Sequence, residues 1–232
     1  MTTLRMAEIF GFSLVFWVAA IACAGEPVSL FDGKTLDGWD GDPKFWSVED
    51  GAITGKTTPD NPTPGNTFLI WRKGELEDFE LHLKFRITGG NSGIQFRSKD
   101  RGGWSVGGYQ ADFDASSAWT GVLFEEGPGG RTIVAGRGKK VAISETGERT
   151  EVAATASEQE ILNALRKEGA WNDYVVIARG NQITLKVNGV TTAEVIDSEE
   201  GKSASRGILA LQLHAGPPME VQVKDVLLTK LK

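Results

Sequence analysis

Apolar and polar side chains alternate along most of the chain after residue 25, which predicts β-strands with one buried face each. The clearest run covers residues 78–88 and a second covers 207–215. One side of the first run is apolar throughout and consists of Phe79, Leu81, Leu83, Phe85 and Ile87. In the second run, Leu209, Leu211 and Leu213 share one side, while Gln212 and His214 lie on the other. Both runs therefore predict strands whose apolar face packs in a core.

Two shorter runs lie between residues 91 and 114, joined by a glycine-rich loop. The apolar positions of these runs are Ile94, Phe96, Tyr109, Ala111 and Phe113. The opposite positions are Gln95, Arg97, Gln110, Asp112 and Asp114. Simple alternation thus predicts that Arg97 faces two aspartates and two glutamines on neighbouring strands. This concentration of polar groups favours a built site over a randomly polar surface, although antiparallel sheets often carry such pairs on a solvated face.

Turn and cap residues divide the rest of the chain. Asp50-Gly51 and Asn188-Gly189 predict tight hairpin turns, because both dipeptides tolerate positive φ. Residues 157–167 form the one predicted helix, with a capping box from Ser157 to Glu160 and Gly169 as its stop. Residues 125–140 are expected to form a long connection, which could arch over the site.

Many short strands separated by turns, with a single helix, predict an all-β fold. We expect a jelly-roll sandwich of two antiparallel sheets with one short helix. The expected core residues between the sheets are Phe79, Leu81, Leu83, Phe85, Ile94, Phe96, Leu209, Leu211 and Leu213.

Length and charge narrow the function. The 232 residues and 29 glycines suit one large β-domain, here expected over 28–232, and no linker or repeat divides it. The formal net charge of -6 argues against nucleic acid as the partner, because binding a polyanion needs a basic stripe. A small neutral ligand fits this charge better.

The first 24 residues predict a cleaved signal peptide. Arg5 precedes an apolar run from Ile9 to Ile21, and the small residues that follow suit signal peptidase. Cleavage after Ala24 would release a secreted or periplasmic chain with no membrane span and no cysteine. The alternative is a lipid anchor on Cys23, the only cysteine.

Several catalytic classes lack their motifs. The two histidines are far apart in sequence and no cysteine pair exists, so no dedicated metal site is predicted. The chain also lacks the Gly-x-Ser-x-Gly elbow of serine hydrolases. Glycosidase chemistry by two carboxylates stays open, and its candidates are Glu80, Asp112, Asp114 and Glu125.

Four segments resemble one known family. They are NSGIQFR from Asn91, GYQADFD from Gly108, WNDYVVIARGNQITLKVNG from Trp171 and GILALQLH from Gly207. They are similar to the DUF1080 family, described as 3-keto-disaccharide hydrolase or 3-keto-glucoside-1,2-lyase/3-keto-2-hydroxy-glucal hydratase domains. The chain departs from the family pattern at two positions, because it has Gln110 where Glu is common and Asp112 where Gln is common.

The resemblance implies a concanavalin/LamG-like form of the jelly-roll sandwich. It also implies cleavage of sugars that are already oxidised at C3. The ketone acidifies the C2 hydrogen, a base removes it, the group at C1 is expelled, and hydration of the glucal can follow. An imidazole suits the base near neutral pH and a cation suits the enolate. The catalytic candidates are therefore His214 as base, Arg97 for the enolate and Glu80 as an orienting group, with Gln212 as a neighbour that binds substrate.

The remaining candidates bind substrate. They are Asn91, Gln95, Gln110, Asp112, Asp114 and the aromatic Trp104, with Trp119 as a second stacking ring. No cofactor is implied with certainty, but a divalent cation could polarise the ketone and be held near Glu80 or Asp114. The competing hypothesis is a jelly-roll module that binds carbohydrate without turning it over.

Overall fold

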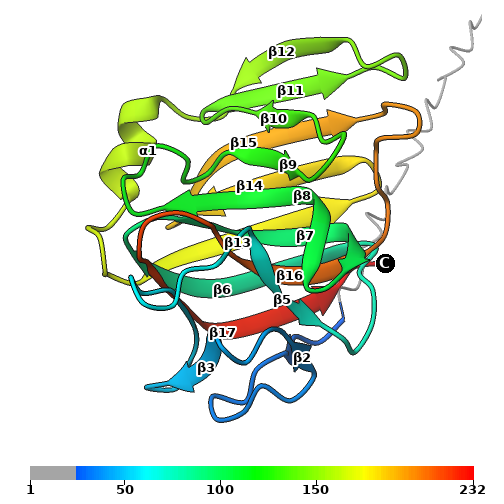
Figure 1. Cartoon of the computed structure of the whole chain (residues 1–232). Coiled ribbons are helices and arrows are strands. Elements are labelled where there is room, and N and C mark those ends of the chain that lie inside the picture. The colour runs from blue at the N-terminus through cyan, green and yellow to red at the C-terminus, as the bar shows by residue number, and fades with distance from the viewer. Residues whose placement is uncertain (1–24) are drawn as a thin grey trace, which may run out of the picture.

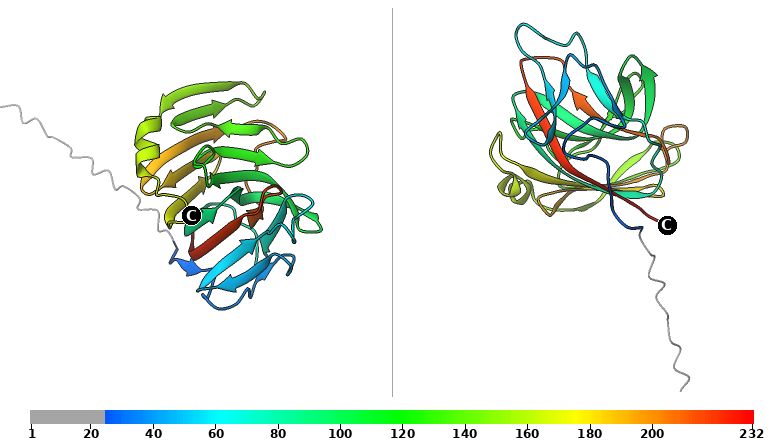
Figure 2. Two further views of the ribbon diagram at one scale, coloured as in Figure 1. Left: turned by 60° about the vertical axis from the view of Figure 1, so that its left-hand side comes forward. Right: turned by 90° about the horizontal axis from the view of Figure 1, so that it is seen from below.

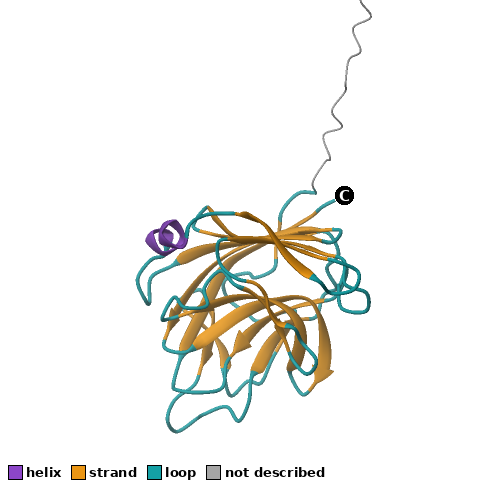
Figure 3. Ribbon diagram, turned by 90° about the horizontal axis from the view of Figure 1, so that it is seen from above, coloured by secondary structure: helices purple, strands orange, loops and turns teal. Residues whose placement is uncertain are grey.

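The computed structural model describes residues 25–232 as a sandwich of two β-sheets, seen edge-on in Figure 3. The predicted signal peptide and Cys23 lie outside these residues. The ten-stranded sheet contains β1 (Val28–Ser29), β3 (Trp46–Glu49), β4 (Ala52–Lys56), β6 (Phe79–Thr88), β11 (Lys139–Ile143), β12 (Arg149–Ala154), β13 (Asn172–Arg179), β14 (Gln182–Val187), β15 (Val190–Asp197) and β17 (Glu220–Lys230). The seven-stranded sheet contains β2 (Trp39–Asp40), β5 (Thr67–Trp71), β7 (Asn91–Gly102), β8 (Ser105–Asp114), β9 (Leu123–Glu126), β10 (Thr132–Ala135) and β16 (Ile208–Leu213).

Strands distant in sequence are neighbours in both sheets (Figure 1). The larger sheet has the order β12-β11-β15-β14-β13-β6-β17-β4-β3, with β1 on β17, and the smaller has the order β10-β9-β8-β7-β16-β5-β2. The predicted sandwich of two sheets is confirmed, with one exception to antiparallel pairing. Strand β11 pairs with β15 in parallel, because the chain crosses from the smaller sheet after β10 before it enters the larger one.

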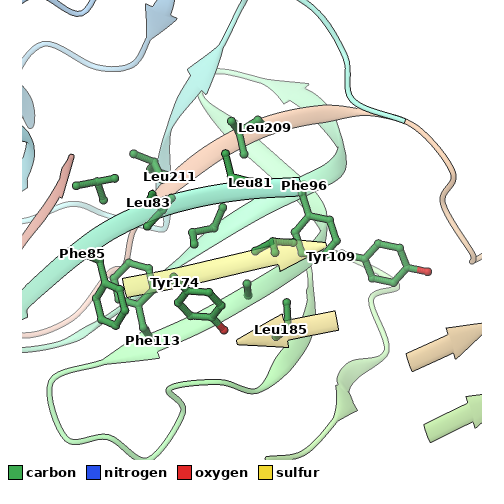
Figure 4. Close-up of a cluster of buried hydrophobic side chains, with 14 of the residues drawn as sticks. Leu81, Leu83, Phe85, Phe96, Tyr109, Phe113, Tyr174, Leu185, Leu209 and Leu211 are labelled. Atoms are coloured by element: carbon green, nitrogen blue, oxygen red, sulfur yellow. The ribbon is translucent and has the colours of Figure 1, made fainter. Parts of the chain in front are cut away.

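The core lies between the two sheets and contains all nine residues predicted for it. Figure 4 shows leucines of β6 and β16 and aromatic rings of β6, β8 and β13 packed against each other. Phe85 and Phe113 come from opposite sheets, and their ring centroids are 4.2 Å apart. Burial of these side chains in the dry layer is the main stabilising contribution, about 1.5–3 kcal/mol for each large one.

Local predictions were right at the turns and only partly right elsewhere. Asp50-Gly51 and Asn188-Gly189 adopt positive φ, as their hairpin turns require. The connection predicted for residues 125–140 instead contains β10, an edge strand with a bulge beside β9. The alternation of β10 covers only four residues and is flanked by glycines, so the sequence pattern did not identify this strand.

The predicted helix is present but shorter than expected. It covers Glu158–Ala164, and Ser157 and Glu160 form the predicted capping box. The chain is already extended at Leu165, so Gly169 does not end the helix. Only Ile161 is buried, and the helix lies at the edge of the larger sheet (Figure 2).

The β7–β8 hairpin folds back over the outer face of its own sheet. Its register shifts twice, after Phe96 and after Asp100. The tip is fixed by a hydrogen bond from Phe68 N to Trp104 O (3.0 Å) and by an ion pair between Arg72 and Asp100. An apolar cluster is buried beneath the hairpin and contains Phe68, Ile70, Val106 and Ala210. The hairpin therefore covers the outer face of the seven-stranded sheet at β5. The part of this face formed by β8 and β9 stays uncovered by the hairpin and carries polar residues.

Candidate functional site

Four buried polar side chains form a connected network on the outer face of the seven-stranded sheet, here called the polar face. They are Gln95, Gln110, Asp112 and Gln212. Gln95 donates to Gln110 (2.8 Å), and Gln110 donates through Nε2 both to Asp112 Oδ1 (2.6 Å) and to Gln212 Oε1 (3.2 Å). Each is at most 3% exposed, so the cost of burying their amides and carboxyl is offset by these bonds. The structure thus brings together four of the predicted substrate-binding residues.

The carboxyl of Asp112 is the most strongly perturbed acid of the polar face. The pKa of Asp112 is raised to about 8, mainly by burial. The hydrogen bond from Gln110 opposes this shift, and the nearby carboxylates of Glu126 and Asp114 contribute to it. Asp112 is therefore protonated at neutral pH. A buried acid that holds its proton beside a second carboxylate is a typical proton donor of active sites.

Glu126 is the second carboxylate, and the sequence reasoning did not find it. It ends β9 and is half-buried, with Oε1 accepting from Asn66 Nδ2 (3.1 Å) and Oε2 from Gln212 Nε2 (3.4 Å). Alternation along β9 places Glu126 on the same face as Phe124 and places Glu125 on the opposite face. This alternation was the sequence signal that could have identified Glu126. Glu125 instead pairs with Arg131 at the rim of the sandwich.

His214 lies at the end of β16, beside the polar network. Strand alternation places it on the side of Gln212, and Asn66 joins this end to Glu126, because Asn66 Oδ1 accepts from Ala215 N (2.9 Å). The His214 Nδ1 atom lies 2.5 Å from Ala215 O. A carbonyl oxygen only accepts, so Nδ1 carries the hydrogen and Nε2 of the neutral ring keeps a free lone pair. The half-buried imidazole can therefore accept a proton from a ligand.

Asp114 shapes a loop at the edge of the site. Its Oδ1 accepts from Trp119 N (2.9 Å), Thr120 N (3.0 Å) and Thr120 Oγ1 (3.0 Å), and its Oδ2 accepts from Ser116 Oγ and Ala118 N. These bonds show that the carboxylate holds the loop in place, and the expected contact of Asp114 with substrate stays a prediction. The loop presents Trp119, which is 41% exposed and stacks edge-to-face on Phe124.

Arg97 does not lie on the polar face, and the predicted common face of Gln95 and Arg97 is wrong. Its φ of 46° begins the hairpin's bulge, which turns the side chain toward the other sheet. There the guanidinium donates to the carbonyls of Glu77 (2.8 Å), Gly180 (2.7 Å) and Ala204 (3.3 Å) and pairs with Asp78 (2.9 Å). Arg97 thus ties three chain segments together and cannot reach a ligand beside Gln110.

Glu80 is also separated from the other candidates. It lies on the outer face of the ten-stranded sheet, where it bonds to His82. Alternation gives every strand of a sandwich a polar side, but the two sheets direct these sides to opposite surfaces. The core between the sheets therefore separates Glu80 from His214.

The two remaining candidates lie at the margins of the polar face. The indole of Trp104 donates to Asp40 Oδ1 (2.9 Å), which anchors the folded hairpin and removes this ring from the expected stacking position. Asn91 begins β7 opposite Asp114 and is half-buried. Residues 25–232 contain no group of three or more His, Cys, Asp or Glu side chains placed to hold a metal ion. No helix in this range is long and apolar enough to cross a membrane.

Sequence comparison finds one matching family model. It is described as the 3-keto-alpha-glucoside-1,2-lyase-like domain and matches residues 26–229. A 3-keto-disaccharide hydrolase from Bacteroides thetaiotaomicron is 34% identical over 95 residues, which are 34% of this chain and 31% of that protein. The chain thus covers about a third of that relative's length. These findings confirm the resemblance seen in the four sequence segments.

Solved structures support the fold. A candidate glycosyl hydrolase from Parabacteroides distasonis has a TM-score of 0.58 at 18% identity, over 90% of this chain and 94% of that one. A laminarinase catalytic domain from Thermotoga maritima has a TM-score of 0.54 at 11% identity, over 90% and 98%. The carbohydrate-binding module CBM66 from Bacillus subtilis has a TM-score of 0.51 at 15% identity, over 80% and 91%. At these identities the likeness concerns the sandwich fold alone.

Proposed function

We propose that this chain, which belongs to the family of 3-keto-alpha-glucoside-1,2-lyase-like domains, cleaves 3-keto-glucosides and 3-keto-disaccharides on its polar face. Family membership supports a carbohydrate-active enzyme of the glycosidase kind. The reaction assigned here is elimination across C1 and C2 of the oxidised sugar, followed by hydration. One set of contacts supports the assignment. Asn66 bonds both to Glu126 and to the backbone next to His214, and Gln212 and Gln110 connect Glu126 to the buried carboxyl of Asp112.

In the first step His214 acts as the base. Its Nε2 takes the C2 proton, and the electron pair moves onto the C3 oxygen to form an enolate. The side-chain amides of Asn66 and Gln212 hold Glu126 with one N–H each, so each has a second hydrogen to donate to sugar oxygens. Collapse of the enolate then forms the C1–C2 double bond and breaks the bond from C1 to the leaving oxygen.

In the second step the carboxylate pair supplies the leaving group's proton. Asp112 supplies this proton, because burial raises its pKa to about 8 and keeps it protonated at neutral pH. Water then adds its oxygen to C1 of the glucal and returns a proton to the carboxyl of Asp112. The imidazolium of His214 exchanges its proton with solvent and then protonates C2. The sum is hydrolysis with one water consumed, and all three groups regain their starting protonation.

The test follows hydrogen at C2. The full chain is incubated in D₂O with a 3-keto-disaccharide, and the released 3-keto-glucose is examined early by NMR. Elimination and hydration place deuterium at C2, whereas direct displacement of the leaving group by water at C1 leaves hydrogen at C2. 3-keto-glucose kept in D₂O without protein measures exchange due to the ketone alone. If the enzyme releases 3-keto-glucose that carries hydrogen at C2, and not deuterium, the proposed mechanism is refuted.

The Asp112–Glu126 pair also favours a second candidate function, which is ordinary glycosidase chemistry. The matching unoxidised disaccharide distinguishes the two. Cleavage of the unoxidised sugar at a similar rate favours the glycosidase, while binding of both sugars without cleavage favours a carbohydrate-binding module. Substitution of Glu126 by Gln should abolish turnover in either enzyme and should leave a binding module able to bind.

The proposal places this reaction outside the cytoplasm, because residues 9–24 resemble a signal peptide. N-terminal sequencing of the native protein should find a chain that begins after Ala24. A chain that retains Met1 would contradict export, and a lipid on Cys23 would support the anchored form.

A further inference from the structure

A second opening lies beside the polar face, at the carboxyl end of β9. It is a cleft of about 180 Å³ whose lining includes four basic residues and several glycines. One of them is Arg97, which is paired with Asp78. The other three are Lys99 and Arg101 from the folded hairpin and Lys202 from the loop between β15 and β16. Glu126 also lines the cleft, although its carboxylate reaches Asn66 and Gln212 of the polar network. One residue therefore connects the two sites.

The glycines allow Arg101 to lie flat against the cleft floor. A Cβ on Gly107 would come within 2.4 Å of Arg101 Nε, and one on Gly127 within 3.3 Å. Arg101 Nη2 lies 3.5 Å from Pro128 O, and Lys202 Nζ donates to Gly129 O. Both cations therefore contact the loop between β9 and β10. The exposed guanidinium of Arg101 thus lies against backbone atoms of this loop and forms no ion pair within residues 25–232.

The charges of the lining are unbalanced. Within residues 25–232, neither Lys99, Arg101 nor Lys202 forms an ion pair, whereas Glu125 on the same wall is paired with Arg131. The cleft therefore gathers positive charge on a chain whose formal net charge is -6. Cations held by glycine backbone and left without carboxylate partners are suited to bind an oxyanion of a ligand.

We propose that this cleft binds an anionic group, a carboxylate or a sulfate, on the leaving-group sugar of the substrate. The inference rests on the proposed function, because the oxidised ring is taken to lie beside His214 and Asn66. The next sugar unit then passes Glu126 and enters the cleft. Arg101 and Lys202 bind its oxyanion and select acidic 3-keto-disaccharides over neutral ones.

Turnover of three matched 3-keto-disaccharides tests the selection: one whose second sugar is glucose, one with a glucuronate and one with a sulfated glucose. We expect kcat/KM to be about ten- to hundredfold higher for an acidic substrate, as one or two charge-assisted hydrogen bonds provide. The Arg101→Gln and Lys202→Gln variants should lose this preference through KM and should leave the neutral substrate unchanged. Lys44→Gln, an exposed lysine of the β2–β3 connection, is the control. The ratio of uronate to sulfate identifies the natural group.

Equal kcat/KM for neutral and acidic substrates, or a preference that survives in Arg101→Gln and Lys202→Gln, overturns the inference. If no 3-keto-sugar is cleaved, the proposed function fails and the cleft is tested by binding alone. Calorimetric titration of the full chain with an unoxidised glucosyl-glucuronate should then show binding that both variants weaken about tenfold and that added salt reduces. No binding, or binding unchanged in the variants, overturns the inference independently.

Discussion

Gly93 lies directly beneath the side chain of Gln110, and a Cβ on Gly93 would come within 2.4 Å of Gln110 Cγ. The two residues are on adjacent strands, and Gln110 pairs with Gln95 two positions further along β7. The missing side chain creates the space through which Gln110 crosses β7 to reach Gln212 on β16. The glycine of the NSG segment therefore serves the polar network and not a turn.

Replacing Gly93 by Ala should displace Gln110 and break its bonds to Asp112 and Gln212. Because these groups are buried, we expect a loss of about 1–3 kcal/mol in the free energy of unfolding. Urea denaturation measures the loss. Gly65→Ala is the control, since a Cβ there meets nothing within 4 Å. Equal stability of the two variants would show that Gln110 adapts without cost.

The carboxyl of Asp112 should make stability depend on pH. In the unfolded chain an Asp has a pKa of about 3.9, whereas burial raises the folded pKa of Asp112 to about 8. The folded state therefore keeps a proton that the unfolded state releases between these values. This contribution is complete below the unfolded pKa and is lost as the pH rises through the folded one.

Asp112→Asn removes that proton while preserving the shape of the side chain. We expect the free energy of unfolding of the variant, relative to the wild type, to increase by about 1 kcal/mol per pH unit from about pH 5 to about pH 8. Denaturant titrations at several pH values measure the difference. Parallel curves for the two proteins would show that Asp112 ionises normally.

Arg97 should matter for stability and not for catalysis. Arg97→Lys keeps the positive charge but cannot reach three carbonyls and Asp78 from one nitrogen. The side chain is 1% exposed, so we expect a loss of about 2–4 kcal/mol. The exposed Arg179→Lys should change stability by less than about 0.5 kcal/mol.

The folded fraction of Arg97→Lys should retain its kcat/KM on a confirmed substrate within a few-fold. A large loss of kcat with an intact fold would instead return Arg97 to the catalytic residues. This outcome separates the role seen in the structure from the one predicted by simple alternation.

The fold was predictable because it depends on a signal that is local and repeated. Alternation identified the two-sheet core, since a period of two assigns each side chain of a regular strand to one face. It failed at Arg97, where a bulge with positive φ interrupts the period without any sequence signal. It also could not assign Glu80, because the outer faces of two stacked sheets look alike in sequence.

The candidate site was predictable only in part. Gln110, Asp112 and Gln212 share a face that alternation defines, so they were found together. Glu126 and Asn66 were missed, since β9 is four residues long and Asn66 precedes its strand. Their contact spans 60 residues of sequence and depends on how the two strands are placed in the sheet, which alternation does not reveal.

The two histidines allow one comparison to test the location of the active site. Both are accessible to solvent, but His214 lies beside the polar network and His82 lies on the outer face of the other sheet. His214→Gln keeps a hydrogen-bonding side chain that cannot accept a proton at neutral pH. We expect it to lower kcat on a 3-keto-disaccharide by about a hundredfold to ten-thousandfold, as loss of a general base does.

His82→Gln should retain the full rate, and urea denaturation should show similar stability for both variants. Full activity in His214→Gln would move the base to Glu126, and loss of activity in His82→Gln alone would place the reaction on the ten-stranded sheet.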